Sequence, residues 1–268
     1  MIGVDPQLEA AFWATVELAR QRAKGRVPVI GIAGAQGSGK TTLIRRRAGA
    51  DRSIAAFSLD DVYLPRAYRQ LIAKEVHPLF VTRGPPGTHN LLQLGETLDE
   101  VEEASAKSVI VLPAFDKVAD NPLPQSQRPV FKGKPSLILL DGWCLGATPQ
   151  TDAELAAAVN QLEAAEDANG VWRGEVNANL AGGYQEVFGR LDAILHLRAP
   201  SFDVVHAWRC QQEEGLLGRS LTEADRARVG RFIQHFERIT RHMLAGGRRA
   251  DLEVELAPDR SVVAVHGG

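Results

Sequence analysis

Cysteine is scarce in this sequence, which has only Cys144 and Cys210 among its 268 residues. Their spacing is neither that of a C-x-x-C pair nor that of zinc ligands, so neither a disulfide framework nor a structural zinc site is indicated. We expect both to be inert, buried thiols and the protein to work in a reducing cytoplasm.

Long apolar runs and an excess of basic residues are also missing. A transmembrane helix needs about 18 or more consecutive apolar residues, and no such run occurs. The first residues include early acidic side chains and no basic segment followed by an apolar core, so no secretory signal is predicted. The net charge of -2 gives no general attraction to polynucleotides or anionic lipids. We therefore expect neither a nucleic-acid nor a membrane partner.

The residues that are present predict one α/β domain spanning residues 1–268, with inserts. Apolar residues make up 44% of the chain and charged residues 24%, as in an ordinary globular protein. A helix is predicted over residues 6–24 and another from Lys40 to about Ala48. Short apolar runs predict buried strands at 29–33, 54–59, 109–112, 137–140, 193–197 and 252–256. Their alternation with helical stretches favours a doubly wound, mostly parallel sheet.

A glycine-rich loop between the first strand and the next helix matches G-x-x-x-x-G-K-[ST]. Backbone N–H groups of such a loop turn onto phosphate oxygens, the lysine reaches the β and γ oxygens, and the Thr41 hydroxyl can bind Mg²⁺. The sequence therefore predicts a three-layer P-loop NTPase fold that binds ATP and Mg²⁺ through Gly34, Ala35, Gln36, Gly37, Ser38, Gly39, Lys40, Thr41 and Thr42.

An acidic residue, Asp141, directly follows the apolar run at 137–140. It occupies the Walker-B position and is a second candidate magnesium ligand beside Thr41. ATPases commonly place a carboxylate directly after this aspartate to activate water, whereas Gly142 and Trp143 follow here. The sequence also lacks the N-K-x-D element with which GTPases recognise guanine. These absences favour a kinase.

Two adjacent carboxylates, Asp60 and Asp61, follow the strand predicted at 54–59. A kinase needs a carboxylate to orient the acceptor hydroxyl or accept its proton. Strand ends on the P-loop side face the nucleotide, so both carboxylates could reach the γ-phosphate, and this position favours Asp60 as the catalytic residue. Adjacent residues at an extended strand end point to opposite sides, so Asp61 could contact substrate or simply cap a turn.

Several blocks together resemble the D-glycerate 3-kinase group of the phosphoribulokinase, uridine kinase and pantothenate kinase superfamily. Beside the P-loop they are Ser58–Tyr63, R-G-P-P-G-T-H at 83–89, F-D-K at 115–117, D-G-W-C-L-G at 141–146 and W-R-C-Q-Q-E at 208–213. The blocks follow the family's order and run through most of the chain.

The resemblance implies roles for individual residues. Asp60 would act as general base or bind Mg²⁺, as a third magnesium ligand beside Thr41 and Asp141, the acidic Walker-B residue. Lys40 and Arg209 would stabilise the transferring phosphoryl group, Arg209 from a lid at about 205–230. Inserts at about 62–90 and 115–135 would hold the acceptor through Arg83, His89 and Lys117, with Asp61 and Tyr63 beside them. Tyr63 could hydrogen-bond the acceptor or only close a pocket wall.

The implied reaction is ATP-dependent phosphorylation of a hydroxyl group, from D-glycerate to 3-phosphoglycerate. Family members typically have Phe where this chain has Val62, and many have Ser where it has Val118. Both changes bear on the acceptor pocket, so a kinase for pantothenate or a nucleoside stays open as an alternative. A nucleotide-dependent switch or chaperone is a further alternative.

Overall fold

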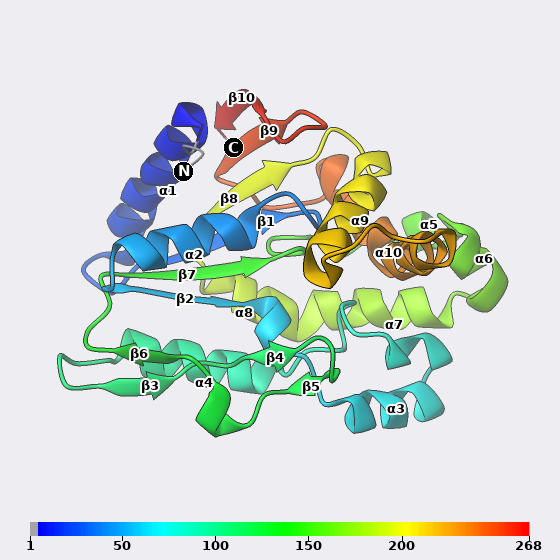
Figure 1. Cartoon of the computed structure of the whole chain (residues 1–268), viewed down its shortest axis with the longest axis horizontal. Coiled ribbons are helices and arrows are strands. Elements are labelled where there is room, and N and C mark those ends of the chain that lie inside the picture. Colours follow the sequence, from blue (N-terminus) through cyan, green and yellow to red (C-terminus); the bar gives the residue numbers. More distant parts are fainter. Residues whose placement is uncertain (1–4, 268) are drawn as a thin grey trace.

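A six-stranded sheet forms the centre of the protein in a computed structural model that describes residues 5–267 (Figure 1). The strand order is β10-β9-β8-β1-β7-β2, and all neighbours are parallel except the antiparallel pair β9–β10. The strands are β1 (Val29–Gly34), β2 (Ile54–Ser58), β7 (Leu137–Gly142), β8 (Ala193–Arg198), β9 (Leu252–Leu256) and β10 (Val262–Gly267). The doubly wound, mostly parallel sheet predicted from the sequence is confirmed. Residues 1–4 and 268 of the predicted domain lie outside the described residues.

Helices connect these strands and cover both faces of the sheet. The α-helices are α1 (Pro6–Ala23), α2 (Lys40–Ala50), α3 (Arg66–Glu75), α4 (Leu91–Glu102), α5 (Asp152–Leu155), α6 (Gln161–Glu166), α7 (Val171–Asn179), α8 (Gln185–Gly189), α9 (Asp203–Leu217) and α10 (Glu223–Leu244). Shorter turns are η1 (Leu59–Asp61), η2 (Pro78–Val81), η3 (Gln125–Gln127) and the π-helical η4 (Leu180–Tyr184). Within residues 5–267, no helix combines the length and apolarity that crossing a membrane requires.

Alternating side chains of the strands build two hydrophobic cores, one on each face of the sheet. Ile30 and Ile32 of β1 belong to the core beneath α1, α2 and α9. Val29 and Ala33 point the other way, into the core shared with α4, α7 and α8. Because consecutive strand residues face opposite sides, continuous apolar runs bury both faces and give three layers.

One predicted strand is not part of this sheet. Residues 109–112 were expected to form a buried parallel strand, but β3 (Val109–Val111) pairs antiparallel with β6 (Val130–Lys132) in a separate two-stranded sheet. Val109 is exposed and only the middle residue, Ile110, is buried. In the predicted run only alternate residues, Ile110 and Leu112, are buried, as in an edge ribbon. A short apolar run does not by itself distinguish such a ribbon from a buried central strand.

Of the segments expected as inserts, residues 62–90 and 115–122 lie beyond the carboxyl ends of β7 and β2, whereas β6, also within 115–135, pairs with β3 toward the other end of these strands (Figure 1). The first contains α3 and η2, and Tyr63 forms an isolated bridge with His89 across it. The second contains the short antiparallel pair β4 (Phe115–Asp116) and β5 (Asn121–Pro122). Helices α9 and α10 lie beyond the carboxyl end of β1 in the same view. These helices, with residues 62–90 and 115–122, therefore surround the carboxyl ends of the parallel strands.

Candidate active site

The P-loop connects β1 to α2 and forms one wall of a cavity of about 740 Å³. Gly34, Gly37 and Gly39 have φ values of 144°, 79° and 100°, a region that disfavours side chains. A Cβ on Gly37 would lie 2.6 Å from the Cβ of Trp208, so glycine is also needed for close packing against α9. The strand, loop and helix arrangement predicted for nucleotide phosphates is thus present.

Lys40 is buried at the start of α2, and its ammonium group donates to the carbonyl of Ala35, 2.9 Å away. Burial lowers its pKa, while the carboxylates of Asp141 and Asp60 act in the opposite direction. The charge is held inside the curve of the loop, where a phosphate would exchange for the Ala35 carbonyl.

Thr41 and Asp141 form a pair of oxygen ligands. The Thr41 hydroxyl donates to Oδ2 of Asp141 at 2.6 Å. Asp141 is 1% exposed, and burial raises its pKa although Lys40 opposes this. Its Oδ1 is buried and has no hydrogen-bond partner within residues 5–267. A hydroxyl beside a carboxylate with a free oxygen fits Mg²⁺, which takes few protein ligands and completes its shell with water and phosphate.

Asp60 lies on the cavity wall, in η1 at the end of β2, but its two oxygens are occupied. The Tyr63 hydroxyl donates to Oδ1 at 2.5 Å, and the Lys117 ammonium lies 2.6 Å from Oδ2. Burial would raise the pKa of Asp60, but the charge of Lys117 and these hydrogen bonds lower it well below its usual range. Asp60 is therefore an ionised carboxylate aimed at the cavity. Lys117 comes from the segment after β4 and lines the cavity as well.

Asp61 points away from the cavity wall. Its carboxylate accepts from the Ser58 backbone N–H at 2.9 Å and completes a capping box on η1. Burial, together with the nearby charges of Asp141 and Asp60, raises the pKa of Asp61 to about 7. Of the two alternatives left open by the sequence, the structure shows the local cap.

His89 lies behind Tyr63 rather than on the cavity wall. Its ring centroid is 4.6 Å from that of Tyr63, and its Nδ1 shares a 2.5 Å hydrogen bond with the Tyr184 hydroxyl. Burial lowers the pKa of His89 to about 3, so the ring is neutral. His89 supports Tyr63, and Tyr63 itself lines the cavity.

Arg83 and Arg209 line both this cavity and a neighbouring one of about 440 Å³. Arg83 pairs with Asp120 at 2.6 Å. Arg209, on α9, pairs with Glu213 and donates to the Gln212 side chain at 2.6 Å. Arg83 and Arg209 therefore both line the proposed active-site cavity, and each forms an ion pair with a protein carboxylate, Asp120 and Glu213 respectively.

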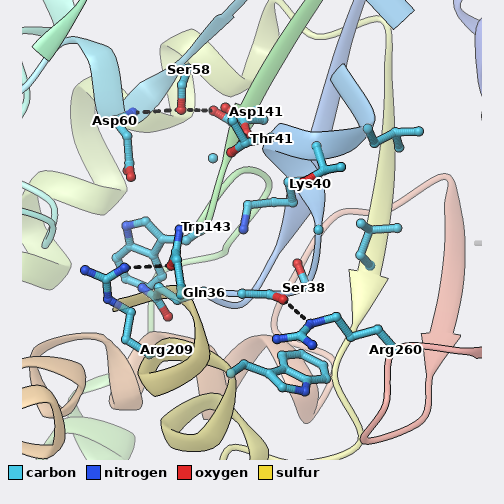
Figure 2. A pocket seen from close by; sticks show the side chains of 18 of the residues that line it. Gln36, Ser38, Lys40, Thr41, Ser58, Asp60, Asp141, Trp143, Arg209 and Arg260 are labelled. Atoms are coloured by element: carbon cyan, nitrogen blue, oxygen red, sulfur yellow. Dashed lines mark hydrogen bonds between the residues drawn. The ribbon is translucent and has the colours of Figure 1, made fainter. Parts of the chain in front are cut away.

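Arg260 was not identified from the sequence and also lines the cavity. Its Nε donates to the Gly37 carbonyl at 2.6 Å, and its guanidinium lies 5.0 Å from the Trp208 ring centroid. The residue has a φ of 71° in the turn between β9 and β10. Figure 2 shows Arg260 and Ser38 at one end of the pocket and Trp143, Gln36 and Arg209 at the other. Arg260 lies in a P-D-R turn whose sequence is that of an ordinary surface turn, and it is 223 positions from Gly37. Nothing in the sequence therefore predicted the contact.

Comparison with proteins of known structure identifies the fold. A D-glycerate 3-kinase from Cryptococcus neoformans var. grubii superposes with a TM-score of 0.77 at 21% identity, over 99% of this chain and 100% of that one. The chain has the three-layer α/β fold of the P-loop kinases, as the sequence predicted.

Sequence comparison gives more specific similarities. The chain is 29% identical over 225 residues to the "uncharacterized kinase mug58" of Schizosaccharomyces pombe, over 80% of this chain and 79% of that protein. It is 30% identical over 199 residues to the chloroplastic D-glycerate 3-kinase of Arabidopsis thaliana. That match covers 69% of this chain but only 41% of the plant enzyme. No family model matches. The resemblance to D-glycerate 3-kinases inferred from the sequence blocks is thereby confirmed.

Proposed function

We propose that this protein is an ATP-dependent kinase that phosphorylates a hydroxyl of a small acidic metabolite, with D-glycerate as acceptor and 3-phosphoglycerate as product. The observation that carries the proposal is the convergence of a complete P-loop, the Thr41–Asp141 pair and the ionised Asp60 on one cavity of about 740 Å³. The similarity to named D-glycerate 3-kinases supports the choice of acceptor.

The nucleotide would place its phosphates in the loop from Gly34 to Thr41. Lys40 would contact the β and γ oxygens in place of the Ala35 carbonyl. Thr41 and Asp141 would hold magnesium, which when bound neutralises phosphate charge. The base would lie toward Arg260, whose guanidinium stacked on Trp208 offers a flat cationic surface at that end of the pocket.

The acceptor would lie between Asp60 and the cations of the inserts. Its carboxylate would bind Arg83 and Lys117, since an arginine fork suits a carboxylate and both side chains line the cavity. A nucleoside acceptor would stack on an aromatic surface, and Tyr63 and Trp143 also line the cavity, but neither would bind a carboxylate as Arg83 and Lys117 would. Lysine and arginine at this wall therefore favour an acidic acceptor.

In the transfer step the acceptor oxygen bonds to the γ-phosphorus, and the bond from that phosphorus to the β–γ bridging oxygen breaks. The electron pair leaves with ADP, and the hydroxyl proton passes to Asp60 once Lys117 has turned from Asp60 to the acceptor carboxylate, which removes the charge that lowers the pKa of Asp60. Lys40 and Arg209 stabilise the charge that spreads over the transferring oxygens. Trp143 and the α9–α10 segment would exclude water that could compete as acceptor.

A coupled assay of ADP release tests the proposal, with Mg-ATP and D-glycerate, L-glycerate, pantothenate or uridine in parallel, and without acceptor as the blank. NMR of the product identifies the phosphorylated carbon. Release only with D-glycerate and a 3-phosphate product are expected. Release with pantothenate or uridine would keep the kinase and refute the acceptor. Failure of all four acceptors with intact ATP binding would refute D-glycerate as the acceptor and leave either an untested metabolite or a nucleotide-dependent switch as the function.

A further inference from the structure

The side-chain amide of Gln36 is in an unusual position for a polar group. Gln36 is the third residue of the P-loop and lines the cavity of about 740 Å³. Both Nε2 and Oε1 are shielded from water, and neither has a hydrogen-bond partner within residues 5–267. Buried amides are nearly always satisfied, because an unmade hydrogen bond costs stability. The structure therefore contains a polar group that a ligand or a moved side chain would have to satisfy.

The backbone carbonyls on either side of Gln36 already have side-chain partners, whereas the hydroxyl of Ser38, further along the loop, is buried without one. The Ala35 carbonyl accepts from Lys40, and the Gly37 carbonyl accepts from Arg260. The conformation on either side of Gln36 is thus tied to the rest of the protein. Gly37 also packs against Trp208, where a Cβ would not fit. The amide cannot find a partner through a simple shift of the loop, because these contacts hold the loop in place.

The surroundings of Gln36 indicate what would satisfy it. Figure 2 shows the side chain at the end of the pocket that Trp143 and Arg209 border, away from Ser38 and Arg260. Arg209 offers only N–H donors and a phosphoryl group offers only acceptor oxygens, whereas an amide has one acceptor and one donor end. If the amide lies between a guanidinium and a phosphoryl group, its oxygen can accept from the guanidinium and its NH₂ group can donate to a phosphoryl oxygen.

We propose that Gln36 is a catalytic residue that links the lid arginine to the transferring phosphoryl group. Its Nε2 donates to an oxygen of the γ-phosphoryl group, and its Oε1 accepts from Arg209. To do so, Arg209 has to leave Gln212 and Glu213, with which it pairs in the structure. The amide thus serves as a preorganised donor at the position where charge develops. This inference rests on the proposed kinase function.

Three variants separate the ends of the amide. Gln36→Leu removes both, and we expect turnover to fall about 10²-fold while the Kd for ATP changes less than about threefold. Gln36→Glu keeps an acceptor for Arg209 but faces phosphate with a negative charge, so its loss should be about tenfold larger. In Arg209→Gln the effect of adding Gln36→Leu should shrink to less than about threefold, because linked residues are not additive.

Stability of the nucleotide-free protein gives a readout independent of activity. Because Leu has nearly the same shape and leaves no polar atom unsatisfied, Gln36→Leu should raise the Tm by about 2 °C or more. Gln125→Leu, at an exposed position of η3, is the matched control and should not raise it. A Tm that falls in Gln36→Leu would overturn the description of the amide as unsatisfied.

Binding of ADP with fluoroaluminate, a mimic of the transferring group, completes the test. Gln36→Leu should bind ADP like the wild type and ADP–fluoroaluminate about 10²-fold more weakly. Turnover within about twofold of wild type, or equal binding of the mimic, would overturn the proposal. If the wild type phosphorylates no acceptor, the proposed function fails by itself, and the mimic then decides the role of Gln36.

Discussion

Replacing Asp60 by asparagine should separate catalysis from stability. The side chain keeps its size and can still accept from Tyr63, but it loses its charge and turns a donor or a neutral oxygen toward Lys117. The Asp60 and Lys117 side chains are 31% and 46% exposed, and pairs this exposed contribute about 0–1 kcal/mol. The Tm should therefore fall by no more than about 4 °C.

Turnover should change far more than stability. A positioned carboxylate that accepts the hydroxyl proton is worth at least about 10² in rate, which is about 3 kcal/mol of activation free energy. The Kd for ATP should stay within about threefold, because the P-loop and the Thr41–Asp141 pair are untouched. Thermal unfolding, ATP titration calorimetry and the coupled ADP assay measure the three quantities separately.

Asp99→Asn is the matched control, because Asp99 also pairs with a cation, Arg190, but lies on α4. It removes the same charge and should leave turnover unchanged. Turnover of Asp60→Asn within about twofold of wild type would remove Asp60 from the mechanism. Loss of ATP binding together with a large fall in Tm would show that the substitution acts on the fold instead.

Three further predictions follow from the site and its surroundings. Arg83→Gln should raise the KM for the acidic acceptor about 10- to 10²-fold in the coupled assay and leave the Kd for ATP unchanged, since it removes a charged hydrogen bond to the acceptor carboxylate; an unchanged KM would place the carboxylate elsewhere. Arg260→Gln should weaken ATP about tenfold but not inorganic tripolyphosphate in calorimetric titrations, because the base alone loses its stacking surface; equal weakening of both would mean that the Gly37 contact matters instead. Burial lowers the pKa of His235 to about 4. Between pH 6.5 and 4 the unfolded chain therefore binds more protons than the folded protein, and the free energy of unfolding falls as the pH is lowered. Between pH 7 and 4 His235→Gln should lose about 3 kcal/mol less free energy of unfolding than the wild type in denaturant titrations, and an equal loss would contradict this assignment.

The parts of the site that are contiguous in the chain could be predicted from the sequence. The strand before Gly34, the loop and the helix from Lys40 follow from local conformation and spacing alone. Asp141 and Asp60 followed from a general rule, that residues after parallel strands meet at one edge of the sheet. These predictions needed no knowledge of which segments pack together.

Contacts between distant segments could not be predicted in the same way. Nothing local distinguishes the apolar run of β3 from that of β7, because both are short runs of Val, Ile or Leu, yet β7 is buried throughout and β3 only at Ile110. Arg260 reaches Gly37 from a turn whose sequence is that of any polar surface loop. His89 was expected among the acceptor contacts, whereas the structure places it behind Tyr63. Such positions depend on the packing of whole segments.

The charges of the site have one property in common, which bears on how substrates would bind. The three cations proposed to contact the acceptor and the transferring phosphoryl group beyond the P-loop each contact a carboxylate of the protein: Lys117 with Asp60, Arg83 with Asp120 and Arg209 with Glu213. An isolated charge in a partly buried site would be costly, so these pairs keep the empty site stable. Phosphate or carboxylate groups of substrates would then exchange for protein carboxylates rather than meet bare cations. Binding would gain only the difference between two similar ion pairs, so geometry, rather than net attraction, would decide which acceptor is bound.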